Sequence, residues 1–108
     1  MEQNANESKL KITMNQDGEE YTFVLEGRMD TLTSPDLEDR VEEVIGQAKT
    51  LIFDMGKVEY ISSAGLRVLM GAAQELEEND GEVIIRHITK PVQEVFDVTG
   101  FSDAFRIE

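Results

Sequence analysis

The stretch VEYISSAGLRVLM, residues 58–70, joins a strand-like run to a helix-like run through two adjacent serines. Serine is a favoured helix N-cap, because its hydroxyl accepts a hydrogen bond from one of the first free backbone N–H groups. One serine is enough for that role. No Glu or Gln stands three residues after either serine, so the reciprocal capping box is missing. The second hydroxyl therefore has two possible explanations: a spare cap, or a serine presented to a partner.

Upstream of this stretch, two segments alternate apolar and polar residues with the period of a β-strand. Asp17-Gly18 lies between the two segments and is typical of a tight turn. The pattern predicts a β-hairpin. Its apolar positions are Leu10, Ile12, Met14, Tyr21, Phe23 and Leu25.

Helical periodicity is found in three segments, at residues 33–49, 62–80 and 90–100. In the first of them, Ser34 is predicted to be the N-cap and Pro35 the first helical residue. A buried strand is predicted at residues 50–55, a further strand at 82–88, and a last edge strand could follow at 105–108. The expected apolar helix faces consist of Leu37, Val41, Val44, Ile45, Ala48, Leu66, Leu69, Met70, Ala73, Leu76, Val92, Val95, Phe96 and Thr99.

The resulting order, β-β-α-β-α-β-α with the optional last strand, predicts an α/β fold with right-handed crossovers and largely parallel pairing. We expect one domain over residues 9–108, with a mixed, mainly parallel sheet of four to five strands. An N-terminal hairpin begins the sheet, and three to four helices pack on it. The polar residues 1–8 are predicted to form a disordered tail.

The charge balance, 10 basic against 23 acidic residues and a net charge of −13, argues against nucleic acid and anionic membranes as partners. The absence of cysteine excludes disulfides, thiolate metal sites and cysteine nucleophiles. With one histidine and dispersed acids, no metal site is expected. The sequence has no signal peptide and no apolar run of membrane-spanning length, so a cytoplasmic protein is expected.

An enzyme that uses Ser63 is a rival class that the sequence supports poorly. Ile61 stands where the Gly-x-Ser-x-Gly elbow of a hydrolase has its first glycine. No glycine-rich phosphate loop is present. His87 is the only histidine, and it lies within an apolar strand pattern without a nearby acid or serine in the sequence. A credible base and a phosphate cradle are therefore both missing.

The residues around the two serines suit a binding site that can be switched. Ala64 and Gly65 are small, and we expect them to leave the backbone open to close approach. A phosphate on either hydroxyl would add about −1.5 to −2 charges at pH 7. The positive end of a helix tolerates such a charge, so the fold need not change. A partner docked on the same spot would be repelled or blocked.

Residues 9–108 resemble the STAS domain, the single-domain anti-sigma factor antagonists of bacteria. VEYISSAGLRVL is similar to the family's strand-loop-helix signature, which carries a phosphorylatable serine. LEGRMDTLTSPDLEDRV is similar to the Gly-Arg-Leu-Asp turn that leads into the first helix. LIFDMGKVEYI is similar to the central strand and its exit. These segments occur in the family's order.

The resemblance places the phosphoacceptor on Ser63, with Ser62 as the alternative. Ser62 stands where many members have Asp, and Arg67 stands where many have Gly. Leu66 matches the motif directly. The partner-binding residues that the resemblance implies are Asp30, Ser62, Ser63, Ala64, Gly65 and Arg67.

The implied function is that of a binding module without chemistry or cofactor of its own. The unmodified protein is expected to sequester an anti-sigma factor of the serine-kinase type and so to free a sigma factor. The kinase phosphorylates the serine and ends the interaction, and a PP2C-type phosphatase restores it. The alternative is an adaptor in another signalling pathway, or a soluble STAS subunit of a transporter complex.

Overall fold

The computed structural model describes residues 9–108, so the tail predicted at residues 1–8 lies outside the described residues. The elements follow one another as β1 (Leu10–Asp17), β2 (Glu20–Met29), α1 (Ser34–Glu42), β3 (Thr50–Ile61), α2 (Ser63–Glu78), β4 (Glu82–Arg86), α3 (Lys90–Thr99), the 3-10 helix η2 (Phe101–Ala104) and β5 (Arg106–Ile107). This order confirms the predicted α/β fold and adds the short helix η2.

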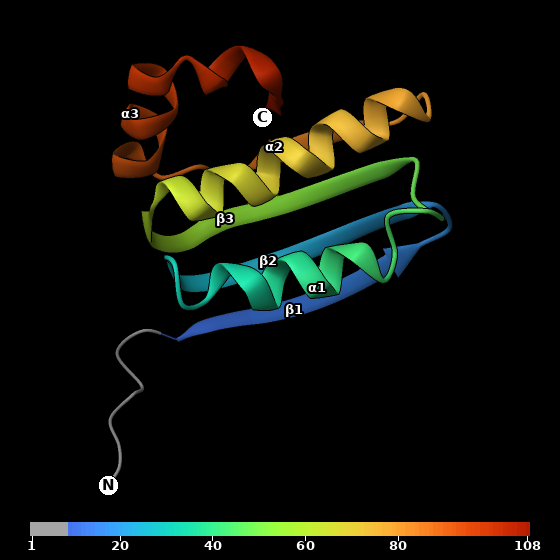
Figure 1. Ribbon diagram of the computed structural model, residues 1–108, viewed down its shortest axis with the longest axis horizontal. Helices are drawn as coiled ribbons and strands as arrows, with labels where there is room; N and C mark the ends of the chain where they lie inside the picture. The colour runs from blue at the N-terminus through green and yellow to red at the C-terminus, as the bar shows by residue number, and fades with distance from the viewer. Residues whose placement is uncertain (1–8) are drawn as a thin grey trace, which may run out of the picture.

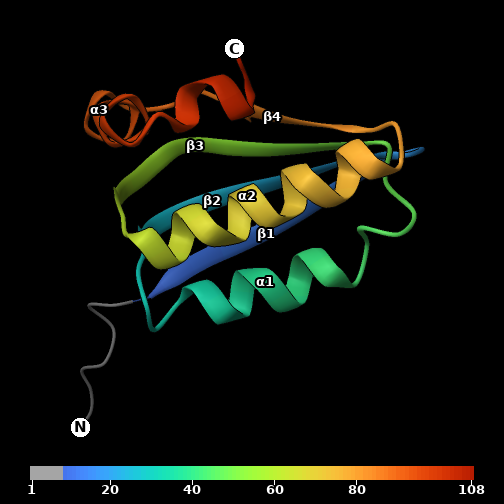
Figure 2. The same cartoon turned by 45° about the horizontal axis from the view of Figure 1, so that its top comes forward.

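All five strands form one sheet, in the order β1-β2-β3-β4-β5. The predicted hairpin is confirmed: β1 pairs antiparallel with β2, from Leu10 opposite Gly27 to Asp17 opposite Glu20. The other neighbouring strands pair in parallel, as the alternation of strands and helices requires. Helices α1 and α2 lie side by side on one face of the sheet (Figures 1 and 2).

Strand β3 is longer than the predicted strand at residues 50–55, because it continues to Ile61. The apolar pattern breaks at Gly56 and Lys57, which are exposed, and resumes at the buried Val58. Along the same stretch the pairing of β2 with β3 shifts register twice. With these two shifts in register, β3 stays paired with β2 across the break in its apolar pattern. The strand ends at Ile61, directly before the N-cap of α2.

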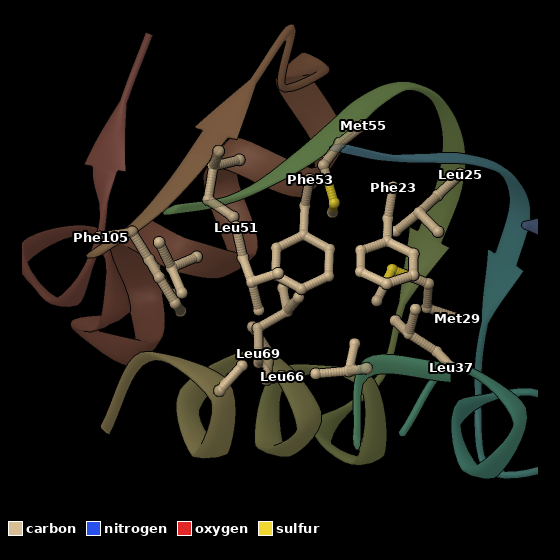
Figure 3. Close-up of a cluster of buried hydrophobic side chains, with 14 of the residues drawn as sticks. Phe23, Leu25, Met29, Leu37, Leu51, Phe53, Met55, Leu66, Leu69 and Phe105 are labelled. Carbon is tan, nitrogen blue, oxygen red and sulfur yellow. The ribbon is translucent and has the colours of Figure 1, made fainter. Parts of the chain in front are cut away.

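The core lies between the sheet and α1 and α2. Phe23 of β2 and Phe53 of β3 stack with their ring centroids 5.7 Å apart. Leu37 of α1 and Leu66 of α2 point toward these rings (Figure 3). All four side chains are buried, and burial of each stabilises the fold by about 1.5–3 kcal/mol. The packing of Leu66 therefore holds the first turn of α2 against the sheet.

Two residue assignments within the predicted helices are wrong. The N-cap of α1 is Thr33 rather than Ser34, which lies one residue inside the helix with its hydroxyl buried and without a hydrogen-bond partner among residues 9–108. Thr99 is exposed rather than part of the buried face of α3, and its hydroxyl donates to the carbonyl of Val95 over 2.7 Å. Thr within a helix commonly bonds back in this way to the carbonyl four residues earlier.

The α-helix of α1 ends at Glu42, and residues 43–47 continue as turns rather than as the predicted helix. Ile45 and Ala48 are nevertheless buried, as predicted. Among residues 9–108, no helix has the length and apolar character needed to cross a membrane.

Asp97 fastens the end of α3 to η2. Its carboxylate accepts hydrogen bonds from the Ser102 hydroxyl at 2.6 Å and from the Gln93 amide at 2.8 Å. These two bonds lower the pKa of Asp97 from its ordinary value of 3.8, and burial opposes them only weakly.

Because the pKa of Asp97 is lower in the folded chain than in the unfolded chain, its contribution to stability is complete above the unfolded pKa and is lost as pH falls through the folded pKa. We expect Asp97→Asn to flatten the fall in melting temperature below about pH 4. Thermal melts across an acid pH series measure this. Identical pH profiles for the two proteins would contradict it.

Candidate functional site

The ends of β2 and β3 fix the position of the two serines. Met29 and Ile61 are the last paired residues of the parallel ladder between these strands. The backbone N–H of Ser62 then donates to the Met29 carbonyl over 2.8 Å. The loop after β2 and the first turn of α2 are therefore held together at the carboxyl edge of the sheet.

Ser62 is the N-cap of α2, so one serine of the pair takes the capping role expected from the sequence. Its backbone is extended, with φ −98° and ψ 176°. The Ser62 hydroxyl accepts a long hydrogen bond, 3.5 Å, from the Gly65 N–H, and its carbonyl accepts from the Leu66 N–H at 3.0 Å. The side chain is half-buried and engaged in the helix start.

Ser63 is the first residue of α2 and is exposed. Its hydroxyl makes no hydrogen bond to any residue of the described chain, 9–108. The two serines thus differ in role: Ser62 caps, and the Ser63 hydroxyl is available to a partner. Because it stands at the N-terminus of a 16-residue helix, added negative charge there is favoured by the helix dipole.

The expectation that Gly65 leaves the backbone open to a partner is wrong, because Gly65 is buried. A Cβ at this position would lie 2.9 Å from Cγ1 of Ile61, 3.0 Å from Cβ of Met29 and 3.2 Å from the Met29 carbonyl oxygen. Glycine therefore lets α2 approach the ends of β2 and β3. Ala64 is half-buried beside it, and Arg67 is exposed.

Asp30 orders the loop between β2 and α1. Its Oδ1 accepts from the backbone N–H groups of Leu32 at 3.0 Å and of Thr33 at 3.1 Å. The Thr33 hydroxyl donates to the Arg28 carbonyl over 2.7 Å. Asp30 directly follows Met29, so the hydrogen bond between Met29 and Ser62 brings this loop next to the serines. Asp30 therefore lies in the loop beside the serines, and its role in binding a partner stays a prediction.

Two exposed apolar side chains near the serines were not predicted from the sequence. Leu32, in the loop that Asp30 orders, is 76% exposed, and Tyr60, two residues before Ser62, is 42% exposed. The Arg28 guanidinium stacks on the Tyr60 ring, 4.5 Å from its centroid. Tyrosine is enriched in protein–protein interfaces, and the exposed Leu32 adds apolar surface that a partner could cover. A leucine isolated in the polar turn MDTLTSP was the available signal.

A hollow of about 380 Å³ opens beside Ser63, between α2 and the end of α3. Its wall combines the serine with apolar, neutral polar and basic side chains. The lining residues are Ser63, Leu66, Arg67, Met70, Gln74, Thr99 and Phe101. No carboxylate lines it, although the chain carries 23 acidic residues.

His87 makes no hydrogen bond to Ser63 among the described residues, so it is not placed to act as a base for this serine. It directly follows β4 rather than lying inside it, in the left-handed region with φ +59°. Its Nδ1 lies 3.1 Å from Oδ1 of Asp54, which also accepts from the Gly56 N–H. This pairing has no signal in the local sequence, because Asp54 lies on the neighbouring strand β3. In the described residues, no group of three or more His, Asp or Glu side chains is arranged to hold a metal ion.

Known proteins with similar sequences cover most of the chain. BtrV of Bordetella bronchiseptica is 29% identical over 99 residues, which are 91% of this chain and 85% of that protein. The anti-sigma-B factor antagonist of Listeria monocytogenes is 26% identical over 93 residues, 85% of this chain and 82% of that protein.

Solved structures share the fold. The anti-sigma factor antagonist SpoIIAA in its unphosphorylated form matches with a TM-score of 0.76 and 19% identity, over 91% of this chain and 87% of that one. Its phosphorylated Bacillus form matches with a TM-score of 0.75. An anti-sigma factor antagonist of Mycobacterium paratuberculosis matches with a TM-score of 0.80 and 22% identity, over 93% and 86% of the two chains.

The match to a protein-family model covers nearly all of the described chain. It includes the hairpin, the ordered Asp30 loop, the capped start of α2 and the C-terminal helix. The model of the STAS domain matches residues 11–108. The chain therefore belongs to the STAS domain family.

Proposed function

We propose that this chain is an anti-sigma factor antagonist whose binding is switched by phosphorylation of Ser63. The observation that carries the proposal is the exposed, unengaged Ser63 hydroxyl at the start of α2, in the position where the family signature has its phosphoacceptor. Sequence relatives that bear the name anti-sigma-B factor antagonist support it. The structural neighbour SpoIIAA has been solved with and without phosphate.

In the unphosphorylated state, the chain binds an anti-sigma factor of the serine-kinase type and so frees a sigma factor. The binding surface combines Asp30, Ser62, Ser63, Ala64 and Arg67 with the exposed Leu32 and Tyr60. Gly65 is buried beneath this surface, and its lack of a Cβ lets α2 approach Met29. The centre of a protein–protein interface is usually apolar and depleted of charged residues. We therefore expect the partner to contact Ser63 as a neutral hydroxyl.

Phosphorylation ends the interaction. The kinase transfers the γ-phosphoryl group of ATP to Oγ of Ser63: the new O–P bond forms, the bond to ADP breaks, and the hydroxyl proton passes to a base of the kinase. The phosphate puts about −1.5 to −2 charges on a surface that the partner would have to desolvate. A PP2C-type phosphatase reverses the step. The chain itself is a substrate and a binding module in the cytoplasm.

The enzyme alternative finds no support around Ser63, because the single histidine pairs with Asp54 and does not bond to the serine. An adaptor in another pathway, or a subunit of a transporter complex, would use the same surface with a different partner. Pull-down with the unphosphorylated chain separates these possibilities: a serine kinase supports the proposal, and a transporter ATPase contradicts it.

Mass spectrometry of the protein from its native cells, with localisation of the phosphate, tests the switch. We expect phosphate on Ser63, because Ser62 is half-buried and engaged as the cap. Phosphate found only on Ser62 would show that Ser62, rather than Ser63, is the phosphoacceptor. An unmodified chain under every growth condition, including those that activate its kinase partner, would contradict the proposal.

Leu32→Ala is expected to weaken binding of the anti-sigma factor about tenfold, the effect of losing an apolar anchor worth roughly 1.4 kcal/mol. Because Leu32 is 76% exposed, the free energy of unfolding should change by less than about 0.5 kcal/mol. Isothermal titration calorimetry and urea denaturation measure the two quantities. An unchanged affinity would remove Leu32 from the binding surface.

A further inference from the structure

Arg67 stands four residues after Ser63 on α2, so the two side chains leave the helix on the same face. Both are exposed, and both line the hollow of about 380 Å³ beside the end of α3. Arg67 makes no ion pair and no side-chain hydrogen bond with any residue in the described range 9–108. By contrast, Arg28 and Arg86 each have a carboxylate partner, at 3.8 and 3.1 Å.

The hollow suits an anion because its remaining lining is neutral. Apart from Arg67 and Ser63, its walls are formed by Leu66, Met70, Gln74, Thr99 and Phe101. In a chain with a net charge of −13, a surface depression with one cation and no carboxylate has a local charge opposite to that of the molecule. A phosphate that entered it would meet no repulsion from the walls.

Carboxylates do face Arg67 from its other side. It also lines a smaller hollow, of about 110 Å³, between α1 and α2, together with Glu38, Glu42 and Glu75. None of these carboxylates comes within 4.0 Å of the guanidinium in the described chain. Arg67 therefore lies between an acidic hollow, with which it forms no ion pair, and the neutral hollow that contains Ser63.

We propose that Arg67 is a clamp for the phosphate on Ser63: once Ser63 is phosphorylated, the guanidinium binds the phosphate in the hollow beside α3. This inference rests on the proposed function, because it needs Ser63 to be the phosphorylated residue. The phosphate carries about two charges and three acceptor oxygens, so it competes well against single carboxylates. An acidic group four residues before a basic one is also the favourable order on a helix.

The clamp gives the switch a defined off state. A phosphate held by Arg67 lies beside the half-buried Phe101, which would otherwise be available to an apolar side chain of the partner. It also engages Arg67, which belongs to the proposed binding surface. Phosphorylation thus removes one charged contact and covers one apolar contact, in addition to placing charge at Ser63.

The test uses the full chain with phosphoserine installed at position 63 during translation, without kinase or partner. Titration followed by ³¹P NMR gives the second pKa of the phosphate, which is near 6 without perturbation. Because the Arg67 cation stabilises the dianion, we expect Arg67→Gln to raise this pKa by about 0.5. Arg67→Lys should retain most of the effect, since it keeps the charge.

Arg40→Gln is the matched control, because it removes the same charge from a surface lined by Leu10, Ile12, Asp36 and Asp39. It should leave the phosphate pKa nearly unchanged. Equal shifts for Arg40→Gln and Arg67→Gln, or no shift for either, would overturn the clamp. Because the phosphate is installed and no partner is present, such a result would leave the proposed function standing. If the chain were instead found to bind no anti-sigma factor, the titration would still show whether Arg67 binds a phosphate on Ser63.

Discussion

Gly65→Ala is expected to lower the free energy of unfolding by about 1–3 kcal/mol, as overpacking at a close contact does. Alanine is ordinarily the better helix residue and would gain roughly 1 kcal/mol in an open position. Here its Cβ would lie 2.9 Å from Ile61 and 3.0 Å from Met29, at atoms close to both backbones that cannot swing away. The start of α2 must then move away from the ends of β2 and β3.

Gly71 supplies the matched control in the same helix. A Cβ there would meet nothing within 4 Å, so Gly71→Ala should raise the free energy of unfolding by about 0.5–1 kcal/mol. Urea denaturation of both variants gives the two signs directly. If Gly65→Ala also stabilised the protein, the close contact of α2 with Met29 would not limit this position.

Ser63→Asp is expected to weaken the complex with the anti-sigma factor about 100-fold, whereas Ser63→Ala should keep the Kd within about threefold. A factor of 100 corresponds to roughly 2.7 kcal/mol, in the range of a charge that the interface buries without a partner. Ser63 makes no hydrogen bond in the described chain, so removal of its hydroxyl leaves the fold intact. Calorimetric titration of both variants against the same partner measures the difference.

Asn15→Asp controls for net charge, because it adds one negative charge without changing the shape of the side chain. Asn15 is exposed on β1, where it alternates with Ile12 and Met14, which pack toward the core on the helix-covered face. It therefore lies on the opposite face of the sheet from α2. Its Kd should equal that of the unchanged chain. Equal affinities for Ser63→Asp and Ser63→Ala would contradict a charge switch at this serine.

Local patterns predicted most of the fold. The alternation around Phe23 and the Asp17-Gly18 pair defined the hairpin, and the helical stripes identified α1, α2 and α3. The end of β3 was not predicted, because the register shifts between β2 and β3 cannot be inferred from the residues of β3 alone. The cap of α1 was misplaced by one residue, because Thr33 is held by the Arg28 carbonyl and by Asp30 from the preceding turn.

The candidate site was predicted where the motif is continuous and missed where it is assembled across elements. The pair of serines before the helical run correctly indicated a capped start of α2, and the structure assigns the cap to Ser62. Gly65 was misinterpreted, since only the structure shows Met29 packed against it. Tyr60 was hidden in a strand pattern, and the pairing of His87 with Asp54 requires knowledge of which strands are neighbours. Long-range contacts of this kind carry no local signal.

The central claim is that phosphorylation of Ser63 by the bound partner ends binding. Native mass spectrometry of the chain mixed with its anti-sigma factor, before and after addition of ATP and Mg²⁺, tests this claim most directly. We predict a heterocomplex before ATP; afterwards, we predict free chain that carries one phosphate on Ser63. A complex that persists with Ser63 fully phosphorylated, or that dissociates with Ser63 unmodified, would contradict the account.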